Sequence, residues 1–271
     1  MYWVGHAGTH PGYLRSNNED AYLLLPEKGL FVVADGMAGH RYGELASAIA
    51  VNTMRRFYLS KELDRLLSAQ FKRAKQAGLE ARTVSYEQFK LKRSVEEANL
   101  AIFNTSRRNP QYETMGTTLV ALLLAGKQAY LAHVGDSRIY RMRGSSLQQV
   151  TEDHSLLNEY IRMNLVKKED AATFPMKNVI VRALGLSETV DVEVARRSCR
   201  GGDMFLLCSD GLSDMVTETS IGETLSGVPD CAARVDALIH SALNAGGVDN
   251  VTALVVDVQE DAEGDSEGAV A

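Results

Sequence analysis

The feature that most constrains the fold is a series of four short strand-like segments between residues 117 and 150. Gly-containing turns join them, and each connection is only a few residues long. Connections this short favour antiparallel pairing of neighbouring strands. The sequence therefore predicts an antiparallel sheet in the middle of the chain, formed by Thr117 to Leu124, Gln128 to Val134, Ser137 to Met142 and Leu147 to Val150.

Further strand-like runs lie on both sides of this sheet, at 22–25, 30–34, 190–195, 204–208 and 251–258. Apolar residues at helical spacing predict helices grouped between the strands, at 43–58, 63–71, 89–103, 219–225 and 231–243. Each sheet and each amphipathic helix must bury one apolar face, so this order predicts an α+β layered sandwich.

Length and composition predict one large domain followed by a tail. The chain has 271 residues and 45% hydrophobic content, which is ordinary for a globular protein with a deep core. No internal repeat or long linker divides residues 1–258. Residues 259–271 are acidic, polar and poor in apolar side chains, so we expect them to be disordered.

The net charge of −6 argues against a nucleic-acid-binding surface, which needs clustered Lys and Arg. No apolar stretch is long enough to span a bilayer, and the first residues lack the pattern of a secretory signal, so we expect a cytoplasmic protein without a membrane segment. The three cysteines have no CxxC spacing, which disfavours a disulfide framework and a zinc site.

Acidic residues stand next to four of the apolar segments. Asp35, Asp136 and Asp210 follow such segments, and Asp249 precedes another. Carboxylates at the rim of a buried sheet repel one another, and a bound cation resolves this conflict. Because the ligands are oxygen atoms, the cluster favours Mg²⁺ or Mn²⁺ over Zn²⁺ or Cu²⁺. Gly36 lets the backbone approach such an ion closely.

A plainer reading exists for each acid alone. An isolated Asp-Gly pair usually forms a turn, and Gly135-Asp136 is also a good hairpin signal. Upstream, Arg15 could bind phosphate oxygens, while Glu19 and Asp20 could orient metal-bound water. On composition alone, a polar N-terminal loop with an internal salt bridge is the favoured interpretation of these three residues.

Taken together, the motifs resemble the metal-dependent protein phosphatases, the type 2C or PPM family, in its bacterial branch. They follow the order of that family over almost the whole chain. The matching blocks are Arg15 with Asn18-Glu19-Asp20, Val33 to His40, Gly43-Glu44, Met115 to Thr118, Ala132 to Arg138, Thr151 to Ser155, Arg182 to Gly185, Leu207 to Leu212 and Asp249 to Thr252.

This resemblance implies a four-layer αββα sandwich, with two stacked antiparallel sheets flanked by helices and metals bound at one edge. It implies two Mn²⁺ or Mg²⁺ ions per site, with Asp35 bridging them and the Gly36 carbonyl on the first. Asp210 and Asp249 would bind the second ion, and Glu19 and Asp20 would act through water. A third ion would lie at Asp136 with Asp210.

The implied activity is hydrolysis of phosphoserine and phosphothreonine in proteins by a hydroxide that bridges the two ions. The expected catalytic residues are Arg15, Asp35 and His40. Arg15 would hold the phosphate. Met37 stands where eukaryotic relatives carry a proton-donating histidine, so His40 or a metal-bound water is the expected donor, although His40 could equally well only hold a loop.

Three other functions compete with this one. A catalytically weak binding or sensing module of the same fold would be expected to have lost its metal ligands. A metal-dependent nuclease would need a basic groove, and a calcium site of the EF-hand type would need a spacing that this chain lacks.

The family also implies partners and a mobile subdomain. Phosphorylated substrates of a bacterial eukaryotic-like Ser/Thr kinase are the expected partners, and the enzyme is expected to be a monomer. Residues 155–175 correspond to the family's flap, which we expect to influence substrate choice.

Overall fold

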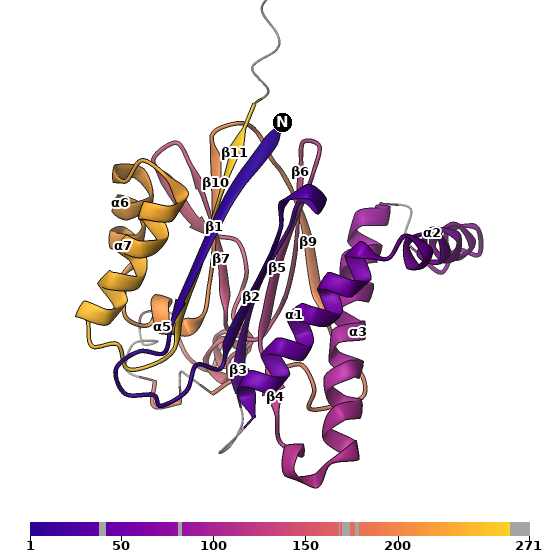
Figure 1. Cartoon of the computed structure of the whole chain (residues 1–271), viewed down its shortest axis with the longest axis horizontal. Coiled ribbons are helices and arrows are strands. Elements are labelled where there is room, and N and C mark those ends of the chain that lie inside the picture. Colours follow the sequence, from indigo (N-terminus) through magenta and orange to yellow (C-terminus); the bar gives the residue numbers. More distant parts are fainter. Residues whose placement is uncertain (38–41, 81–82, 168, 170–173, 177–178, 261–271) are drawn as a thin grey trace, which may run out of the picture.

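The computed structural model describes residues 1–37, 42–80, 83–167, 169, 174–176 and 179–260. Two antiparallel sheets form its centre (Figure 1). One has the strand order β1-β11-β10-β7-β8. It contains β1 (Tyr2–His10), β7 (Arg138–Arg143), β8 (Ser146–Gln149), β10 (Asp203–Cys208) and β11 (Val251–Gln259).

The other sheet has the order β2-β3-β5-β6-β9, with the short strand β4 paired to β3. Its members are β2 (Asp20–Leu25), β3 (Leu30–Met37), β4 (Gly116–Thr117), β5 (Leu119–Ala125), β6 (Gln128–Val134) and β9 (Glu193–Ser198). The predicted hairpins therefore form, but they divide between two sheets: β5 and β6 lie in one, β7 and β8 in the other.

Helices cover the outer face of each sheet (Figure 1). The second sheet is covered by α1 (Gly43–Leu59) and α3 (Tyr86–Arg108), and α2 (Lys61–Gln76) projects beyond them. The first sheet is covered by α6 (Glu218–Gly227) and α7 (Cys231–Asn244). The shorter helices are α4 (Leu156–Arg162), α5 (Asp210–Ser213), η1 (Pro26–Lys28) and η2 (Pro110–Tyr112).

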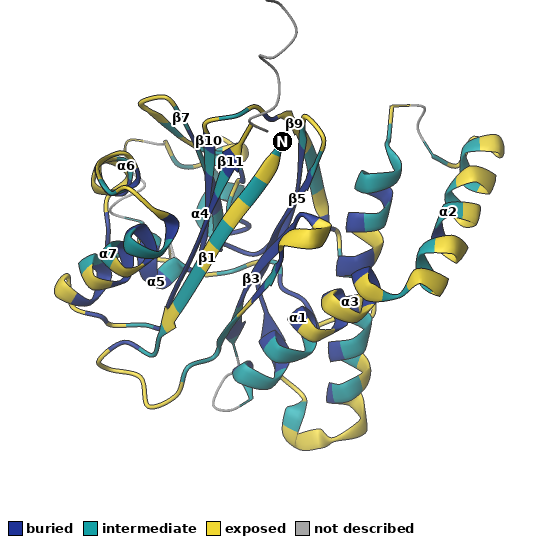
Figure 2. Ribbon diagram, turned by 45° about the horizontal axis from the view of Figure 1, so that its top comes forward, coloured by how far each residue is buried: buried dark blue, intermediate teal, exposed yellow. Residues whose placement is uncertain are grey.

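Three apolar clusters hold these layers together. Phe31, Phe205 and Leu254 belong to the cluster between the two sheets, and all three are fully buried. A second cluster joins one sheet to α1 and α3, and a third joins the other sheet to α6 and α7. Figure 2 shows the same pattern, with buried strands and a largely exposed α2. The predicted four-layer αββα sandwich is confirmed.

Some elements differ from the sequence predictions. The N-terminal strand β1 was not predicted, and it pairs with β11 along its whole length. The strand expected at 190–195 lies at Glu193–Ser198. The strand β11 continues to Gln259, and residues 261–271 lie outside the described part, so the disordered tail stays a prediction.

Candidate metal centre

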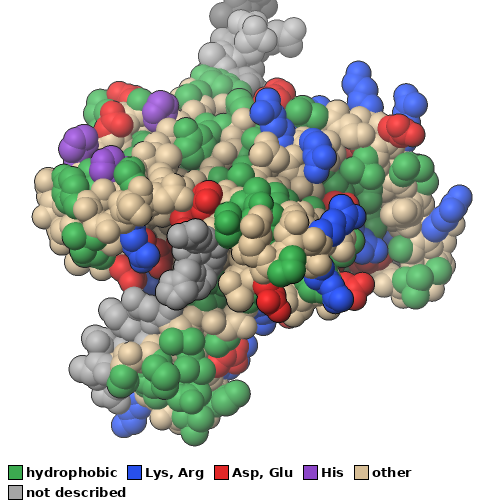
Figure 3. Space-filling view, turned by 60° about the horizontal axis from the view of Figure 1, so that its bottom comes forward, with side chains coloured by type: hydrophobic (Ala, Val, Ile, Leu, Met, Phe, Trp, Pro, Cys, Tyr) green, Lys and Arg blue, Asp and Glu red, His purple; other side chains and the backbone are tan. Residues whose placement is uncertain are grey.

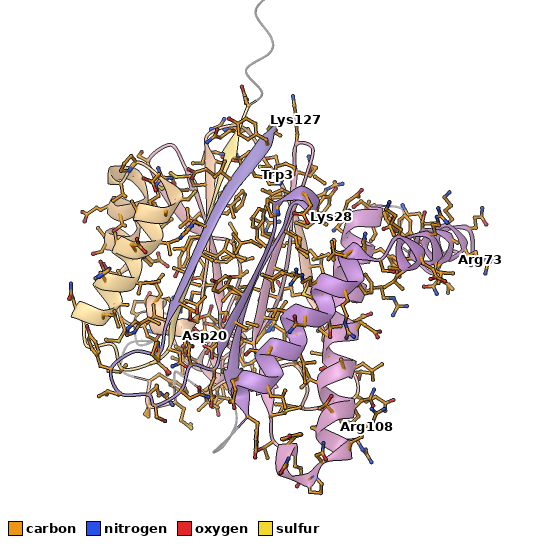
Figure 4. The ribbon with its side chains drawn as sticks, viewed as in Figure 1. Trp3, Asp20, Lys28, Arg73, Arg108 and Lys127 are labelled. Atoms are coloured by element: carbon orange, nitrogen blue, oxygen red, sulfur yellow. The ribbon has the colours of Figure 1, made fainter. Side chains whose placement is uncertain are left out.

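The ends of several strands bring acidic residues together at one end of the sandwich. Asp20 and Asp35 are direct partners in the β2–β3 register, so their side chains share one face of the sheet. Asp210 opens α5 directly after β10, Asp249 precedes β11, and Asp136 follows β6. Figure 4 shows Asp20 at this end of the molecule.

A cavity of about 260 Å³ opens among these residues. Figure 3 brings this end of the molecule forward and shows Asp and Glu side chains in a hollow of the surface. The cavity is lined by Arg15, Ser16, Asn17, Glu19, Asp35, Gly36, Met37, Thr118, Ile180, Asp210, Asp249 and Asn250.

The first turn of α1 is packed tightly against the end of β3. A Cβ atom at Gly36 would lie 2.1 Å from the Gly43 carbonyl oxygen, and one at Gly43 would lie 2.2 Å from Glu19 Oε2. The Glu19 carbonyl accepts hydrogen bonds from the Gly36 amide at 3.0 Å and from Ser47 Oγ at 2.6 Å. Only glycine fits at these two positions, which explains both glycines in the sequence motif.

Asp20 is held by two hydroxyl groups. Its Oδ2 accepts from Ser209 Oγ at 2.8 Å and from Thr252 Oγ1 at 2.6 Å, whereas its buried Oδ1 has no hydrogen-bond partner. Burial raises the pKa of Asp20 to about 7, although the two hydroxyl groups oppose this shift. The side chain is therefore a poorly compensated carboxylate at neutral pH.

Three other acids share this environment. Burial, together with the negative charges of Asp20, Asp210 and Asp136, raises the pKa of Asp35 well above its ordinary value. Burial and the charge of Asp210 raise the pKa of Asp136 to about 7. For Asp210, burial and the charge of Asp249 raise the pKa to about 6.

These carboxylates fit a bound divalent cation. Asp136 is only 8% exposed, and its Oδ1, like that of Asp20, is buried without a hydrogen-bond partner. Among the described cavity-lining residues, Arg15 is the one cation, and it binds Asp249. Neutralising the other acids requires a cation from outside the chain, and oxygen ligands suit Mg²⁺ and Mn²⁺.

Two residues organise the mouth of the cavity. Arg15 Nη2 donates to Asp249 Oδ2 at 2.7 Å, while the Arg15 side chain remains 57% exposed. Asn250 Oδ1 accepts from the Glu19 amide at 2.8 Å, and its Nδ2 donates to the carbonyls of Pro11 and Asn17. The guanidinium group is thus held at the cavity but is open to an incoming anion.

Most of the predicted site residues meet here. Arg15, Glu19, Asp35, Gly36, Asp210 and Asp249 line one cavity, and Asp20 and Asp136 interact electrostatically with Asp210 beside it. His40 lies outside the described residues. The sequence reasoning gave no role to Thr118, Ser209 and Asn250, which hold the acids, although all three stand in the quoted motifs.

Comparisons with known proteins agree with this site. Residues 8–245 match the family model described as "Protein phosphatase 2C". The chain belongs to the protein phosphatase 2C family.

A serine/threonine phosphatase stp from Listeria monocytogenes serotype 4b is 38% identical over 252 residues, which are 92% of this chain and 93% of that one. The crystal structure of the Mycobacterium tuberculosis serine/threonine phosphatase PstP/Ppp superposes with a TM-score of 0.81 at 34% identity, covering 96% of this chain and 100% of that one. The catalytic domain of PstP in complex with two manganese ions gives a TM-score of 0.79 at 34% identity, covering 96% of this chain and 99% of that one. These similarities extend over more than nine tenths of this chain, and the relatives are bacterial.

Proposed function

We propose that this chain is a metal-dependent protein serine/threonine phosphatase, which hydrolyses phosphoserine and phosphothreonine in other proteins. The observation that carries this proposal is a cavity that combines several half-buried carboxylates, most of them without a basic partner, with one exposed arginine at its mouth. Such a site binds divalent cations and a phosphate group together. Membership of the family and the names of the relatives support the same activity.

The chain's own carboxylates would hold the cations. We assign Asp35, the Gly36 carbonyl, Asp210 and Asp249 to two Mn²⁺ or Mg²⁺ ions, and Glu19 and Asp20 to waters around them. Asp136, together with Asp210, is assigned to a third ion. When bound, two divalent ions lower the pKa of water and offset negative charge on a transferring phosphoryl group.

The protein groups then position the substrate. Arg15 offers a guanidinium fork to the phosphate oxygens, and its bond to Asp249 fixes the distance between the phosphate and the carboxylates. Asn250 fixes Glu19 through the backbone amide. A role for His40 as proton donor to the leaving alcohol remains a prediction from the sequence.

The partners are proposed on the same basis. Phosphorylated proteins are the substrates, and a bacterial eukaryotic-like Ser/Thr kinase is the expected source of their phosphate groups. In the described part of the chain no helix has the length and apolar character to cross a bilayer. Ser155, the first residue of the flap, pairs with Ile180, which lines the cavity. We therefore assign the flap at 155–175 a role in substrate choice. A monomeric state and a cytoplasmic location stay predictions.

The decisive experiment is hydrolysis of a phosphothreonine peptide with Mn²⁺, with Mg²⁺ and with EDTA. We expect phosphate release with Mn²⁺ and none with EDTA, measured as inorganic phosphate over time. The same peptide carrying phosphotyrosine is the matched substrate control. Inactivity with every metal would instead favour the binding-module function, although the intact set of acids argues against it.

A further inference from the structure

A second cluster of titratable residues lies beside Asp136, and the proposed reaction does not use it. His133 and His154 are 4% and 2% exposed, and their rings stack with centroids 4.6 Å apart. Their Nε2 atoms lie 4.0 and 3.4 Å from Glu193 Oε2. Two imidazoles and a carboxylate have the chemistry of a metal site.

The hydrogen bonds of the two rings exclude this metal-binding role in the arrangement observed. The Gly135 amide donates to His154 Nδ1 at 3.1 Å, so a neutral His154 carries its proton on Nε2. His133 Nε2 faces the Glu152 carbonyl at 2.9 Å, and a carbonyl only accepts. Both Nε2 atoms are therefore protonated. The His154 Nε2–H faces the acceptor Glu193 Oε2 at 3.4 Å. The Arg182 guanidinium, 3.2 Å from Nε2, is also a donor, so it adds positive charge there and accepts no hydrogen bond from the ring.

The same bonds make His154 a link between two parts of the cleft. Its side chain accepts the Gly135 amide, and its backbone amide donates to the Gly135 carbonyl at 2.9 Å. Both polar groups of the residue that precedes Asp136 are thus held by His154. On its other side, the His154 carbonyl accepts the Val181 amide at 2.9 Å, next to the cavity-lining Ile180.

The turn at Gly135 is also held from the side of Asp35. Gly135 has a φ of +104°, and a Cβ atom there would lie 2.6 Å from Thr118 Cβ. Thr118 Oγ1 accepts the Asp35 amide at 3.2 Å and lies 2.7 Å from Ser137 Oγ. The Gly135–Asp136 turn therefore sits between Thr118 and His154, and removing either contact frees one side of it.

We propose that His154 is a positioning residue. It holds the Gly135–Asp136 turn and the backbone at Val181 in one arrangement, and it thereby sets the cation affinity of Asp136. This inference rests on the proposed function, because it assumes that Asp136 binds a cation. Without the ring acceptor, the buried Gly135 amide has no partner, and the turn relaxes to recover one.

Two substitutions of His154 separate this role from general packing. Asn places its side-chain oxygen close to the position of Nδ1, whereas Gln places its amide group near Nε2 and leaves the Nδ1 position without an acceptor. His133→Gln is the matched control, because it disturbs the same stacked pair, whereas the His133 Nε2 atom faces the Glu152 carbonyl and not the Gly135 amide. Asp136→Asn identifies the binding step that belongs to Asp136.

The primary readout is Mn²⁺ binding by isothermal titration calorimetry on the full chain. We expect His154→Gln to weaken the step lost in Asp136→Asn by about tenfold, the effect of one lost buried hydrogen bond. His154→Asn and His133→Gln should stay within about twofold of the wild type. Unchanged binding in His154→Gln, or equal weakening in His154→Asn or His133→Gln, would overturn the proposal.

Hydrogen exchange of the wild-type protein gives a measurement that needs no variant to fold. The amides of Gly135 and Val181 should be protected, and their protection should rise together when Mn²⁺ is added. Fast exchange at Gly135 in both states contradicts the proposal. If the wild type binds Mn²⁺ as expected but hydrolyses no phosphopeptide, the proposed function fails while the role of His154 stands.

Discussion

The molecule places buried and half-buried aspartates in two contrasting environments. In one, each acid has a guanidinium partner. Arg143 contacts Asp203 through two 2.7 Å bonds. Arg138 pairs with Asp153 at 2.7 Å, and Arg234 pairs with Asp257 at 2.8 Å. In the other, at the cleft, no Lys or Arg is bonded to the acids in the described part of the chain, apart from Arg15 on Asp249. The cleft acids are Asp20, Asp35, Asp136 and Asp210.

The pKa of Asp203 shifts in the opposite direction to the pKa values of the four cleft acids. Burial alone would raise the pKa of Asp203, but the hydrogen bonds from Arg143 lower it below the ordinary value. At the cleft, burial and mutual repulsion raise the pKa of each acid. The fold thus supplies its own cation where an acid serves stability, and withholds one where the acid is to bind a cation from solution.

Asp35→Asn gives the largest expected change. We expect kcat with saturating Mn²⁺ to fall at least about a thousandfold, because the ligand expected to bridge the two metal ions is lost. Without metal, the same variant should unfold at a higher temperature than the wild type, since one repelling charge is gone. Phosphate release and thermal unfolding in EDTA measure the two effects. Substantial Mn²⁺-dependent turnover would refute the ligand assignment.

The metal-free protein should lose stability as pH rises, because the cleft acids have raised pKa values. The folded pKa values of Asp20, Asp136 and Asp210, about 7, 7 and 6, exceed the unfolded value near 4. Between these values the folded state binds more protons than the unfolded state. The stabilisation that these three groups contribute is therefore fully present below about pH 4 and is lost as pH rises through about 6 to 7.

Between pH 5 and 8, we expect the free energy of unfolding in EDTA to fall by a few kcal/mol. This decrease corresponds to a pKa shift on the order of one unit for each of the three aspartates. Saturating Mn²⁺ should remove most of this decrease. Asp203 acts in the opposite sense: its lowered pKa contributes stability above about pH 4, which is lost as pH falls further. Urea titrations at four pH values test both signs, and a metal-free protein that gains stability from pH 5 to 8 would contradict the prediction.

Arg143→Met should destabilise the protein without affecting catalysis. The Asp203 side chain is fully buried, so removing its partner leaves an uncompensated charge at a cost of about 3 kcal/mol. Urea unfolding measures this cost, and kcat should stay unchanged. Arg197→Met on β9, in the other sheet, is the control. Arg197 is exposed, and its one hydrogen bond within the described part of the chain goes to a backbone carbonyl, so it should cost less than about 0.5 kcal/mol. If both substitutions lowered the free energy of unfolding equally, Arg143 would have no special role as the partner of a buried acid.

The cleft acids could be predicted from the sequence, whereas the Arg–Asp pairs could not. The cleft acids were predictable because each stands directly beside an apolar run, and because two of them precede a glycine that the packing requires. The Arg–Asp pairs were not, since Arg143 and Asp203 become neighbours only through the pairing of β7 with β10. The strand β1 was missed for the same reason: its partner β11 lies at the other end of the chain. Local patterns predict elements, but contacts between distant segments depend on the completed fold.

Arg15 belongs to neither environment, and its substitution should have the smallest effect. It pairs with Asp249 like the structural arginines, but an ion pair this exposed contributes less than about 1 kcal/mol to stability. Arg15→Ala should leave the unfolding temperature almost unchanged and raise KM for a phosphopeptide about tenfold, because the phosphate loses a charged donor pair.

Arg15→Lys should recover only part of this loss, since an ammonium group cannot form two parallel bonds to phosphate. Initial rates over a range of phosphopeptide concentrations, with Mn²⁺ saturating, give KM and kcat for all three proteins. If Arg15→Ala instead lowered stability as much as Arg143→Met and left KM unchanged, Arg15 would be a structural partner of Asp249. The cleft would then have to bind phosphate through its cations alone.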